Sequence, residues 1–411
     1  MTTTPETPTR SADVPTHPAD PFSLEVLADP FTFHEALRDA GPVVHLPAID
    51  VYAMGRYTEV HEALTNWQGF VSSDGVGHLS FRNEEPWRPP SLLLEADPPH
   101  HDAPRRVVTE VLGPRTLTRL REGWFADARA LVDAIVPPGV DSVEIDGQVD
   151  LAEVFPLRVF PDAVGLRQEG RENLLPYGNH LFNAFGPPND LVKQGEPDAP
   201  RLLQSIVEQC GRESLAEGGF GAAIWAAADR GEITHDQAPL LVRSLLSAGV
   251  DTTVHGLAAL LHALSTHPHE YARLQERPQL VRTAFDEAVR LESPVQTFFR
   301  TADVDVEIGG TVVPADSKIL MYLASANRDP RRWDDPDRFD LTRDPSGHVG
   351  FGMGLHQCVG QHIARLESEA VLTALLARVE LIEPLPGARL HLNNTLRGWE
   401  SLPLRLVARR G

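Results

Sequence analysis

The chain has 411 residues, a formal net charge of −21 and only two cysteines. Hydrophobic residues make up 42% of it and charged residues 23%, which is ordinary for a globular protein with a large core. Two cysteines can form at most one disulfide, so a disulfide framework is excluded and a reducing, cytoplasmic location is expected. The acidity argues against a nucleic acid partner, and the lack of an apolar run of about 18 residues argues against a membrane span.

The first twenty residues are rich in Thr and Pro and carry no apolar run, which predicts a disordered leader over 1–20. The remainder, 21–411, shows no internal repeat and is expected to form a single domain. Helical spacing of apolar residues predicts helices over 59–66 and 114–135, with two more between 200 and 230.

The strongest predicted helix runs from Thr234 to about Thr266 and is apolar on nearly every face, which is typical of a helix buried through the middle of a large protein. Asp251, Thr252 and Thr253 lie near its centre, although such residues are poor helix formers. A local rule broken at a buried position tends to mark function.

A further helix is predicted over 279–291, followed by short strands within 304–329 and a loop rich in Pro and Asp that extends to Arg343. A Gly-rich segment, 347–360, then leads into a long helix over 359–379. The fold class that this pattern predicts is mainly α with a small β portion.

Cys358 stands immediately before that last helix. Unpaired backbone N–H groups and the helix dipole favour a thiolate there, and Gly352, Gly354 and Gly360 allow a large planar ligand to approach. No second cysteine or histidine pair is near enough in sequence for a zinc site. A single axial bond to haem iron suits the pattern, with a helix-capping cysteine or a catalytic nucleophile as the alternatives.

The string from Phe351 to Gly360 resembles the haem-binding signature F-G-x-G-x-H-x-C-x-G of bacterial cytochromes P-450 and matches every fixed position. The resemblance implies the cytochrome P-450 fold, haem b as cofactor, Cys358 as the metal ligand and a monooxygenase activity. It also implies a set of residues that hold the cofactor: His101, Arg105, Ala248, Gly249, Arg300, Phe351, Gly352, His356, Cys358 and Gly360.

Two further motifs carry family roles. Glu287 and Arg290 match the family's E-x-x-R, which implies a buried structural network completed by Arg338. Ala248–Thr253 resembles A-G-x-[DE]-T-T, and threonine hydroxyls can bond the carbonyl four residues earlier and bend the helix. The resemblance implies that Asp251 and Thr252 are catalytic, with Thr252 hydrogen-bonding bound dioxygen and Asp251 admitting protons.

Several strings resemble bacterial monooxygenases that oxidise para-substituted benzoic acids, among them LFNAFGPPN and ESPVQTFFRT. O-demethylation or hydroxylation of a substrate such as 4-methoxybenzoate is therefore expected. Size tolerance stays open, because 191–214 departs from those enzymes. The expected substrate residues, which combine cations and hydroxyls for a carboxylate with an apolar slot for a ring, are Arg88, Ser91, Leu94, Phe182, Phe185, Arg243, Ser244, Ser247, Ala248, Val295 and Phe298.

Electrons are expected from a ferredoxin-type redox protein reduced by a flavin reductase. A basic stretch between Arg105 and Arg121 would face the carrier, or would be an ordinary solvated helix surface. The protein is expected to be a soluble monomer. Two other functions remain open: a biosynthetic hydroxylase of a larger metabolite, and a non-catalytic haem sensor, which would have no need for the Asp251–Thr252 pair.

Overall fold

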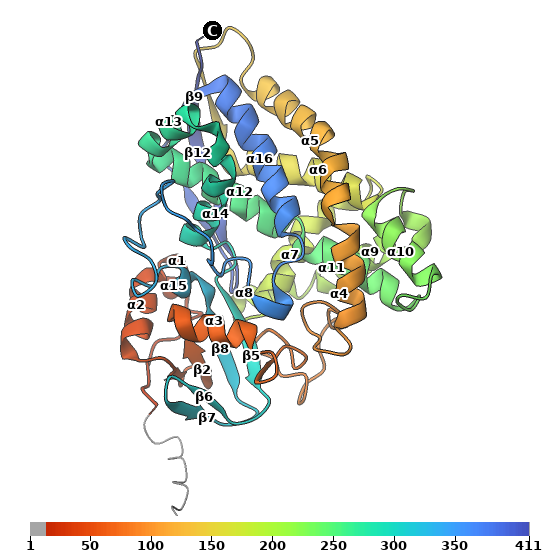
Figure 1. Ribbon diagram of the computed structural model, residues 1–411, viewed down its shortest axis with the longest axis vertical. Coiled ribbons are helices and arrows are strands. Elements are labelled where there is room, and N and C mark those ends of the chain that lie inside the picture. Colours follow the sequence, from red (N-terminus) through yellow and green to blue (C-terminus); the bar gives the residue numbers. More distant parts are fainter. Residues whose placement is uncertain (1–13, 411) are drawn as a thin grey trace, which may run out of the picture.

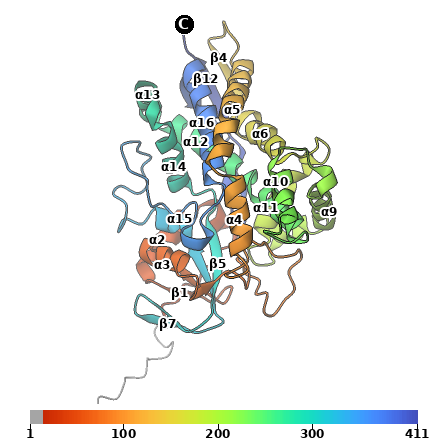
Figure 2. The ribbon, with the colours of Figure 1, turned by 45° about the vertical axis from the view of Figure 1, so that its right-hand side comes forward.

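The computed structural model describes residues 14–410 of the chain. A large helical region lies beside a smaller region built around a mixed sheet (Figure 1, Figure 2). Residues from both regions line one cavity. The helices are α1 (Leu24–Ala28), α2 (Phe31–Ala40), α3 (Tyr57–Thr65), α4 (Asp102–Val111), α5 (Pro114–Ile135), α6 (Val154–Val164), α7 (Leu174–Asn183), α8 (Asp190–Gly195), α9 (Ala199–Gln209), α10 (Phe220–Asp229), α11 (Gln237–Ala248), α12 (Asp251–Thr266), α13 (Pro268–Glu276), α14 (Val281–Glu292), α15 (Leu323–Asn327) and α16 (Gln361–Arg378).

The largest sheet has the order β1-β2-β8-β5-β3, with β2 and β8 parallel and the other pairs antiparallel. The remaining sheets are small: β4-β12-β9, β10-β11 and β6-β7. The strands are β1 (Val44–Leu46), β2 (Val51–Met54), β3 (Phe70–Val71), β4 (Ser142–Asp146), β5 (Thr297–Ala302), β6 (Val306–Ile308), β7 (Thr311–Val313), β8 (Lys318–Tyr322), β9 (Val379–Pro384), β10 (Arg389–Leu392), β11 (Arg397–Ser401) and β12 (Pro403–Ala408). The predicted class, mainly α with a small β portion, is confirmed.

The long central helix is the main departure from the sequence pattern. One helix was expected from Thr234 to Thr266, but the structure divides it into α11 and α12 at Gly249 and Val250. The carbonyl of Ala248 accepts the hydroxyl of Thr252 at 2.7 Å, so a side chain takes the place of a backbone partner. Such bonds bend helices, and here the bend opens the helix beside the cavity.

The helix pair is nevertheless internal, as expected. Thirteen of the sixteen residues of α12 are buried. The run Gln237–Thr266 is long and apolar enough to cross a membrane by length and composition, but 72% of its most apolar window is buried inside the protein. It is therefore accounted for as the core helix around which α14, β9 and β11 pack.

The network around Arg290 corrects one expectation. Arg290 is fully buried and forms two hydrogen bonds with the Glu287 carboxylate, at 2.7 and 2.9 Å. The third member of the network is Arg343, whose Nε donates to Glu287 at 3.1 Å. Arg338 was expected in this role, but its side chain is 52% exposed and only its carbonyl faces Arg290. The loop turns the side chain of Arg338 outward, and five residues later it brings the side chain of Arg343 to the Glu287 carboxylate.

The expected leader also ends earlier than residue 20. Thr16 bridges to His45, the amide of His17 donates to the His45 carbonyl at 3.0 Å, and Ala19 packs against the core beside β1. Residues 14–20 are therefore part of the folded protein. Residues 1–13 lie outside the described residues, so the expectation for them stays a prediction.

Candidate active site

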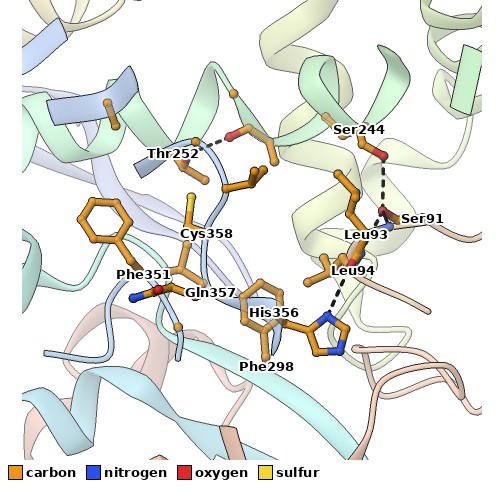
Figure 3. Close-up of a pocket in the computed structure, with 18 of the residues that line it drawn as sticks. Ser91, Leu93, Leu94, Ser244, Thr252, Phe298, Phe351, His356, Gln357 and Cys358 are labelled. Atoms are coloured by element: carbon orange, nitrogen blue, oxygen red, sulfur yellow. Dashed lines mark hydrogen bonds between the residues drawn. The ribbon is translucent and has the colours of Figure 1, made fainter. Parts of the chain in front are cut away.

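Cys358 sits at the end of a tight loop before α16. Its amide donates to the Phe351 carbonyl at 2.8 Å, while Gly352 and Gly354 have φ angles of 65° and 63° that favour glycine. A Cβ on Gly354 would lie 2.7 Å from the Leu64 carbonyl oxygen, so this loop also needs glycine to pack on α3. The loop thereby presents the sulfur into the cavity (Figure 3).

Burial raises the pKa of the Cys358 thiol, and the N–H groups of Gly360 and Gln361 together with Arg105 only partly oppose this effect. The expected helix-terminus effect is present but is outweighed by burial. A thiolate here needs a stronger positive partner, and a metal ion that binds the sulfur supplies one. Within residues 14–410 no group of three His, Cys, Asp or Glu residues could hold a metal, which suits a single protein bond to an iron already held by its own ring.

The cavity beside Cys358 comprises about 1630 Å³ of empty space, a figure that includes its open mouth. Its walls come from the Gly350–Gly360 loop, α11 and α12, α7, β5 and the segment before α4, with Cys358 and Thr252 on facing sides (Figure 3). The space suits a large planar group over the sulfur with a second, smaller ligand beyond it.

Three expected cofactor-binding side chains have unused hydrogen-bonding capacity. Arg105 and Arg300 line the cavity, whereas His101 does not and instead packs its ring against that of His356, with centroids 5.0 Å apart. Both ring nitrogens of His101 are buried and have no partner within residues 14–410. Arg300 is 3% exposed, and among the described residues it donates only to its neighbour's carbonyl, that of Phe299. Arg105 donates to the Gln357 carbonyl at 2.6 Å, next to the sulfur loop.

Burial lowers the pKa of His101 to about 4 and that of Arg300 to about 10, with Asp97 partly offsetting the shift at Arg300. Such groups are stabilised by an acidic partner. The two propionates of haem b have the required charge, so the residues present fit this cofactor. His101, Arg105 and Arg300 would hold it through those carboxylates.

His356 was expected to join them, but its ring is already engaged. One ring nitrogen lies 3.0 Å from the Leu93 carbonyl and the other 3.2 Å from Asp97. Asp97 also accepts the amides of Ser72 and Ser73. His356 therefore joins the cysteine loop to the segment before α4. Sequence reasoning assigned no role to Asp97, its partner in that segment.

The side chains of Thr252 and Asp251 point to different places, although the two residues are neighbours in the chain. Thr252 lines the cavity, whereas Asp251 is 6% exposed and does not. Asp251 lies against Gly178 of α7, where a Cβ would overlap its carboxylate. Burial raises the pKa of Asp251 well above the usual value, and its Oδ2 has no partner in the described chain. The pair thus spans from the cavity to the helix that covers it.

All eleven expected substrate residues line the cavity. Phe182, Phe185 and Phe298 form an edge-to-face series with ring centroids 5.7 and 5.9 Å apart. Ser91 and Ser244 place their hydroxyl oxygens 3.3 Å apart.

The two arginines differ. Arg88 is paired in a bidentate manner with buried Glu95, at 2.8 and 3.1 Å, a partner that sequence reasoning missed. Arg243 donates from Nη2 to the carbonyls of Pro89 and Pro90, at 2.6 and 3.3 Å. Its Nη1 is buried and has no partner among residues 14–410.

The cysteine loop, the unsatisfied cations and the opened helix define a haem-thiolate protein. The chain belongs to the cytochrome P450 family, whose sequence model matches residues 222–396. It is 55% identical over 414 aligned residues to "Cytochrome p450 CYP199A2" of Rhodopseudomonas palustris, covering 99% of this chain and 100% of that protein. It is 30% identical to "Cytochrome P450 monooxygenase PikC" of Streptomyces venezuelae, over 92% of this chain and 91% of that one.

Solved structures agree. CYP109Q5 from Chondromyces apiculatus is 30% identical and superimposes with a TM-score of 0.78, over 95% of this chain and 98% of the other. The fold alone is shared with cytochrome P450 CREJ in complex with (4-ethylphenyl) dihydrogen phosphate, at 22% identity and a TM-score of 0.84 over 94% and 98% of the two chains. The protein is therefore a cytochrome P450 monooxygenase with haem b as its cofactor.

When bound, haem b supplies the iron at which dioxygen is activated. The chain's own residues do the rest. Cys358 would ligate the iron, the α11–α12 opening leaves room on the facing side, and the aromatic residues exclude water from the chamber.

Proposed function

We propose that this monooxygenase oxidises para-substituted benzoic acids, by O-demethylation of a para-methoxy group or hydroxylation of a para-alkyl group. The observation that carries the proposal is the buried Nη1 of Arg243, which has no partner among residues 14–410. Arg243 lines the same, mostly apolar chamber as the Ser91–Ser244 hydroxyl pair. A planar carboxylate accepts hydrogen bonds from a guanidinium and two hydroxyls in that arrangement.

The local charge balance supports an acid. Arg88 and Arg243 are two buried cations, and Glu95 is the anion that pairs with Arg88. One positive charge is left without a paired anion, and burial lowers the pKa of Arg243, with the nearby Arg88 charge adding to the shift. A substrate carboxylate restores neutrality, which a larger neutral metabolite does not do. Arg88 would act indirectly by holding the Pro89–Pro90 turn, to whose carbonyls Arg243 donates.

The positions of the lining residues support the orientation. Arg243 lies on α11 and Thr252 on α12, on either side of the division at Gly249 and Val250, and both line the cavity. A flat acid held at Arg243 would extend past Phe182, Phe185 and Phe298 and direct its para substituent toward the Cys358 side. Positioning of this kind decides which C–H bond is attacked.

Catalysis is assigned to Asp251 and Thr252. Thr252 would present its hydroxyl to bound dioxygen, and Asp251 would relay protons from the α7 side to it. Burial raises the pKa of the Asp251 carboxyl well above its usual value, which favours the protonated form that can donate a proton.

Electrons would come from a ferredoxin-type protein reduced by a flavin reductase. Arg106, Arg115 and Arg119 are exposed on α4 and α5, and the same helix α4 carries Arg105, which donates to the loop of Cys358. An acidic carrier docked there would be near the sulfur side of the site. The proposal also takes the folded chain, which begins by residue 14, as one domain of a cytoplasmic, monomeric protein.

The test is a spectral titration of the ferric, haem-loaded protein. We expect 4-methoxybenzoate to shift the Soret band toward high spin, and methyl 4-methoxybenzoate, its uncharged ester, to do so weakly. Turnover with a ferredoxin system should give 4-hydroxybenzoate and formaldehyde in proportion to NADH used. If no benzoate shifts the band while bulky neutral metabolites do, the enzyme is instead a hydroxylase of larger substrates.

A further inference from the structure

A cluster of asparagines joins α7 and the segment that follows it to the loop between β10 and β11. Because α7 and this segment contribute Phe182 and Phe185 to the cavity lining, they are called the roof of the chamber. Three of them lie on α7 or just before α8, and two open the 393–396 loop. Together they are named the asparagine clamp: Asn179, Asn183, Asn189, Asn393 and Asn394.

Asn394 makes the densest contacts. Its backbone N–H donates to the Asn183 side-chain oxygen at 2.9 Å, and its Nδ2 donates to the Asn183 backbone carbonyl, also at 2.9 Å. With Asn189 it forms a reciprocal amide pair, at 2.8 and 3.1 Å. A Cβ on Gly186 would lie 2.6 Å from the Asn394 side chain, so the turn after α7 closes directly onto it.

Asn393 contacts the middle of the same helix, α7. Its Nδ2 donates to both oxygens of Asn179, at 3.1 Å for the carbonyl and 2.8 Å for the side chain. Its own Oδ1 accepts the amides of Thr395 and Leu396, which keeps the loop in one shape. Asn393 and Asn394 are 3% and 2% exposed, so water competes little for these bonds.

The loop is braced on its opposite side by the chamber wall. The amide of Gln296 donates to the Thr395 carbonyl at 2.8 Å, and the amide of Arg397 donates to that of Pro294 at 2.9 Å. Val295 pairs with Leu396 in a β-bridge. Since Pro294 and Val295 line the cavity, the loop connects one wall of the chamber to its roof.

The roof carries two aromatic residues, Phe182 and Phe185, whose rings take up space in the chamber. Phe182 and Phe185 flank Asn183 in the chain and pack with Leu396 in one apolar cluster. Displacing the α7–α8 connection would therefore move both rings, and the amide bonds must break together for this to happen.

We propose that the asparagine clamp holds the α7–α8 connection on the 393–396 loop and thereby sets the size of ligand that the chamber admits. The five asparagines are positioning residues: they act on ligands through Phe182 and Phe185. The inference concerns ligands of any charge and does not depend on benzoate being the substrate.

The most useful variant is Asn189→Ser. Asn189 caps α8 through its side-chain oxygen, which accepts the Val192 amide, and serine keeps such a cap while it is too short for the amide pair with Asn394. Asn394→Ala removes the centre of the clamp. The matched control is Asn173→Ser, because Asn173 precedes the same helix α7 but bonds Ser205 and Arg201 of α9 instead.

Two measurements on the ligand-free, haem-loaded protein test the clamp. In hydrogen exchange, peptides over 184–195 should lose protection by about tenfold in Asn189→Ser, and more in Asn394→Ala, as expected for losing buried hydrogen-bonded pairs. In stopped flow, the association rate of 4-phenylimidazole should rise by a similar factor, while that of imidazole, which is small enough to enter the closed chamber, changes little.

Unchanged exchange and unchanged 4-phenylimidazole rates in Asn189→Ser would overturn the proposal, whether or not Asn394→Ala folds. Equal effects in Asn173→Ser would also overturn it, because they would show that any loosening of α7 raises the exchange and association rates, with or without the asparagine clamp. Since both azoles are neutral iron ligands, failure of the benzoate assignment leaves this test intact.

Discussion

The hydroxyl of Thr252 donates a 2.7 Å hydrogen bond to the carbonyl of Ala248, and this bond lies at the point where the central helix is divided. The same side chain therefore opens the helix and presents an oxygen to the cavity. Asp251, one residue earlier, faces α7 instead. Under the proposed function, proton delivery and helix opening are thus assigned to adjacent residues.

Replacing Thr252 with alanine should uncouple the enzyme. NADH use should continue while product per NADH falls by at least roughly tenfold and hydrogen peroxide rises, because general acid–base groups typically contribute 10²–10⁴-fold. Thr252→Ser should restore most of the coupling, since it retains the hydroxyl. Coupling unchanged in the alanine variant would remove Thr252 from the assigned role.

Replacing Arg243 with leucine should weaken binding of 4-methoxybenzoate by about 10–100-fold, the value of a charge-assisted hydrogen bond. Binding of the uncharged methyl ester should change little, which spectral titration of both ligands can check. Equal losses for acid and ester would mean that the substitution had damaged the chamber.

Arg88→Leu should behave differently from Arg243→Leu, although both arginines line the cavity. It leaves Glu95 buried without its ion-pair partner, which typically costs about 3–5 kcal/mol of unfolding free energy. Chemical denaturation should show this loss in Arg88→Leu and a smaller one in Arg243→Leu. The reverse order would contradict the structural role given to the Arg88–Glu95 pair.

Arg343→Ala and Arg338→Ala form a matched pair for the network around Arg290. Arg343 donates to the fully buried Glu287, so its loss should destabilise the protein by about 1–3 kcal/mol and lower haem content on purification. The half-exposed Arg338 side chain should be replaceable within about 0.5 kcal/mol. Denaturation midpoints and haem-to-protein ratios distinguish the two.

Stability should fall in acid partly through His255. Burial lowers its pKa to about 3 in the folded protein, with His391 adding to the shift, whereas the unfolded value is about 6.5. The unfolded state therefore binds more protons as the pH drops below 6.5, and folding loses about 2 kcal/mol between pH 7 and pH 5. His255→Gln should remove this part of the pH dependence. His235→Gln, at an exposed position, is the control and should leave it intact.

The features of the site that depend on residues close together in the sequence could be predicted. The cysteine loop, its glycines and the start of α16 lie within ten consecutive residues, so their pattern was sufficient to predict haem ligation. Helix 114–135 was predicted at the bounds of α5, because its apolar spacing is regular. The Asp251–Thr252 pair was recognisable for a related reason, as a polar interruption in an apolar helix.

The sequence by itself determined the fold class, the family and the residues around the chamber, because short motifs and helical periodicity carry that information. Only the tertiary structure decided which partners those residues take. It paired Arg88 with Glu95, exchanged Arg338 for Arg343, engaged His356 with Asp97, and brought five asparagines separated by up to 215 positions into one clamp. Hydrogen bonds and ion pairs between distant segments are set by how helices and loops pack, and no local pattern encodes that packing.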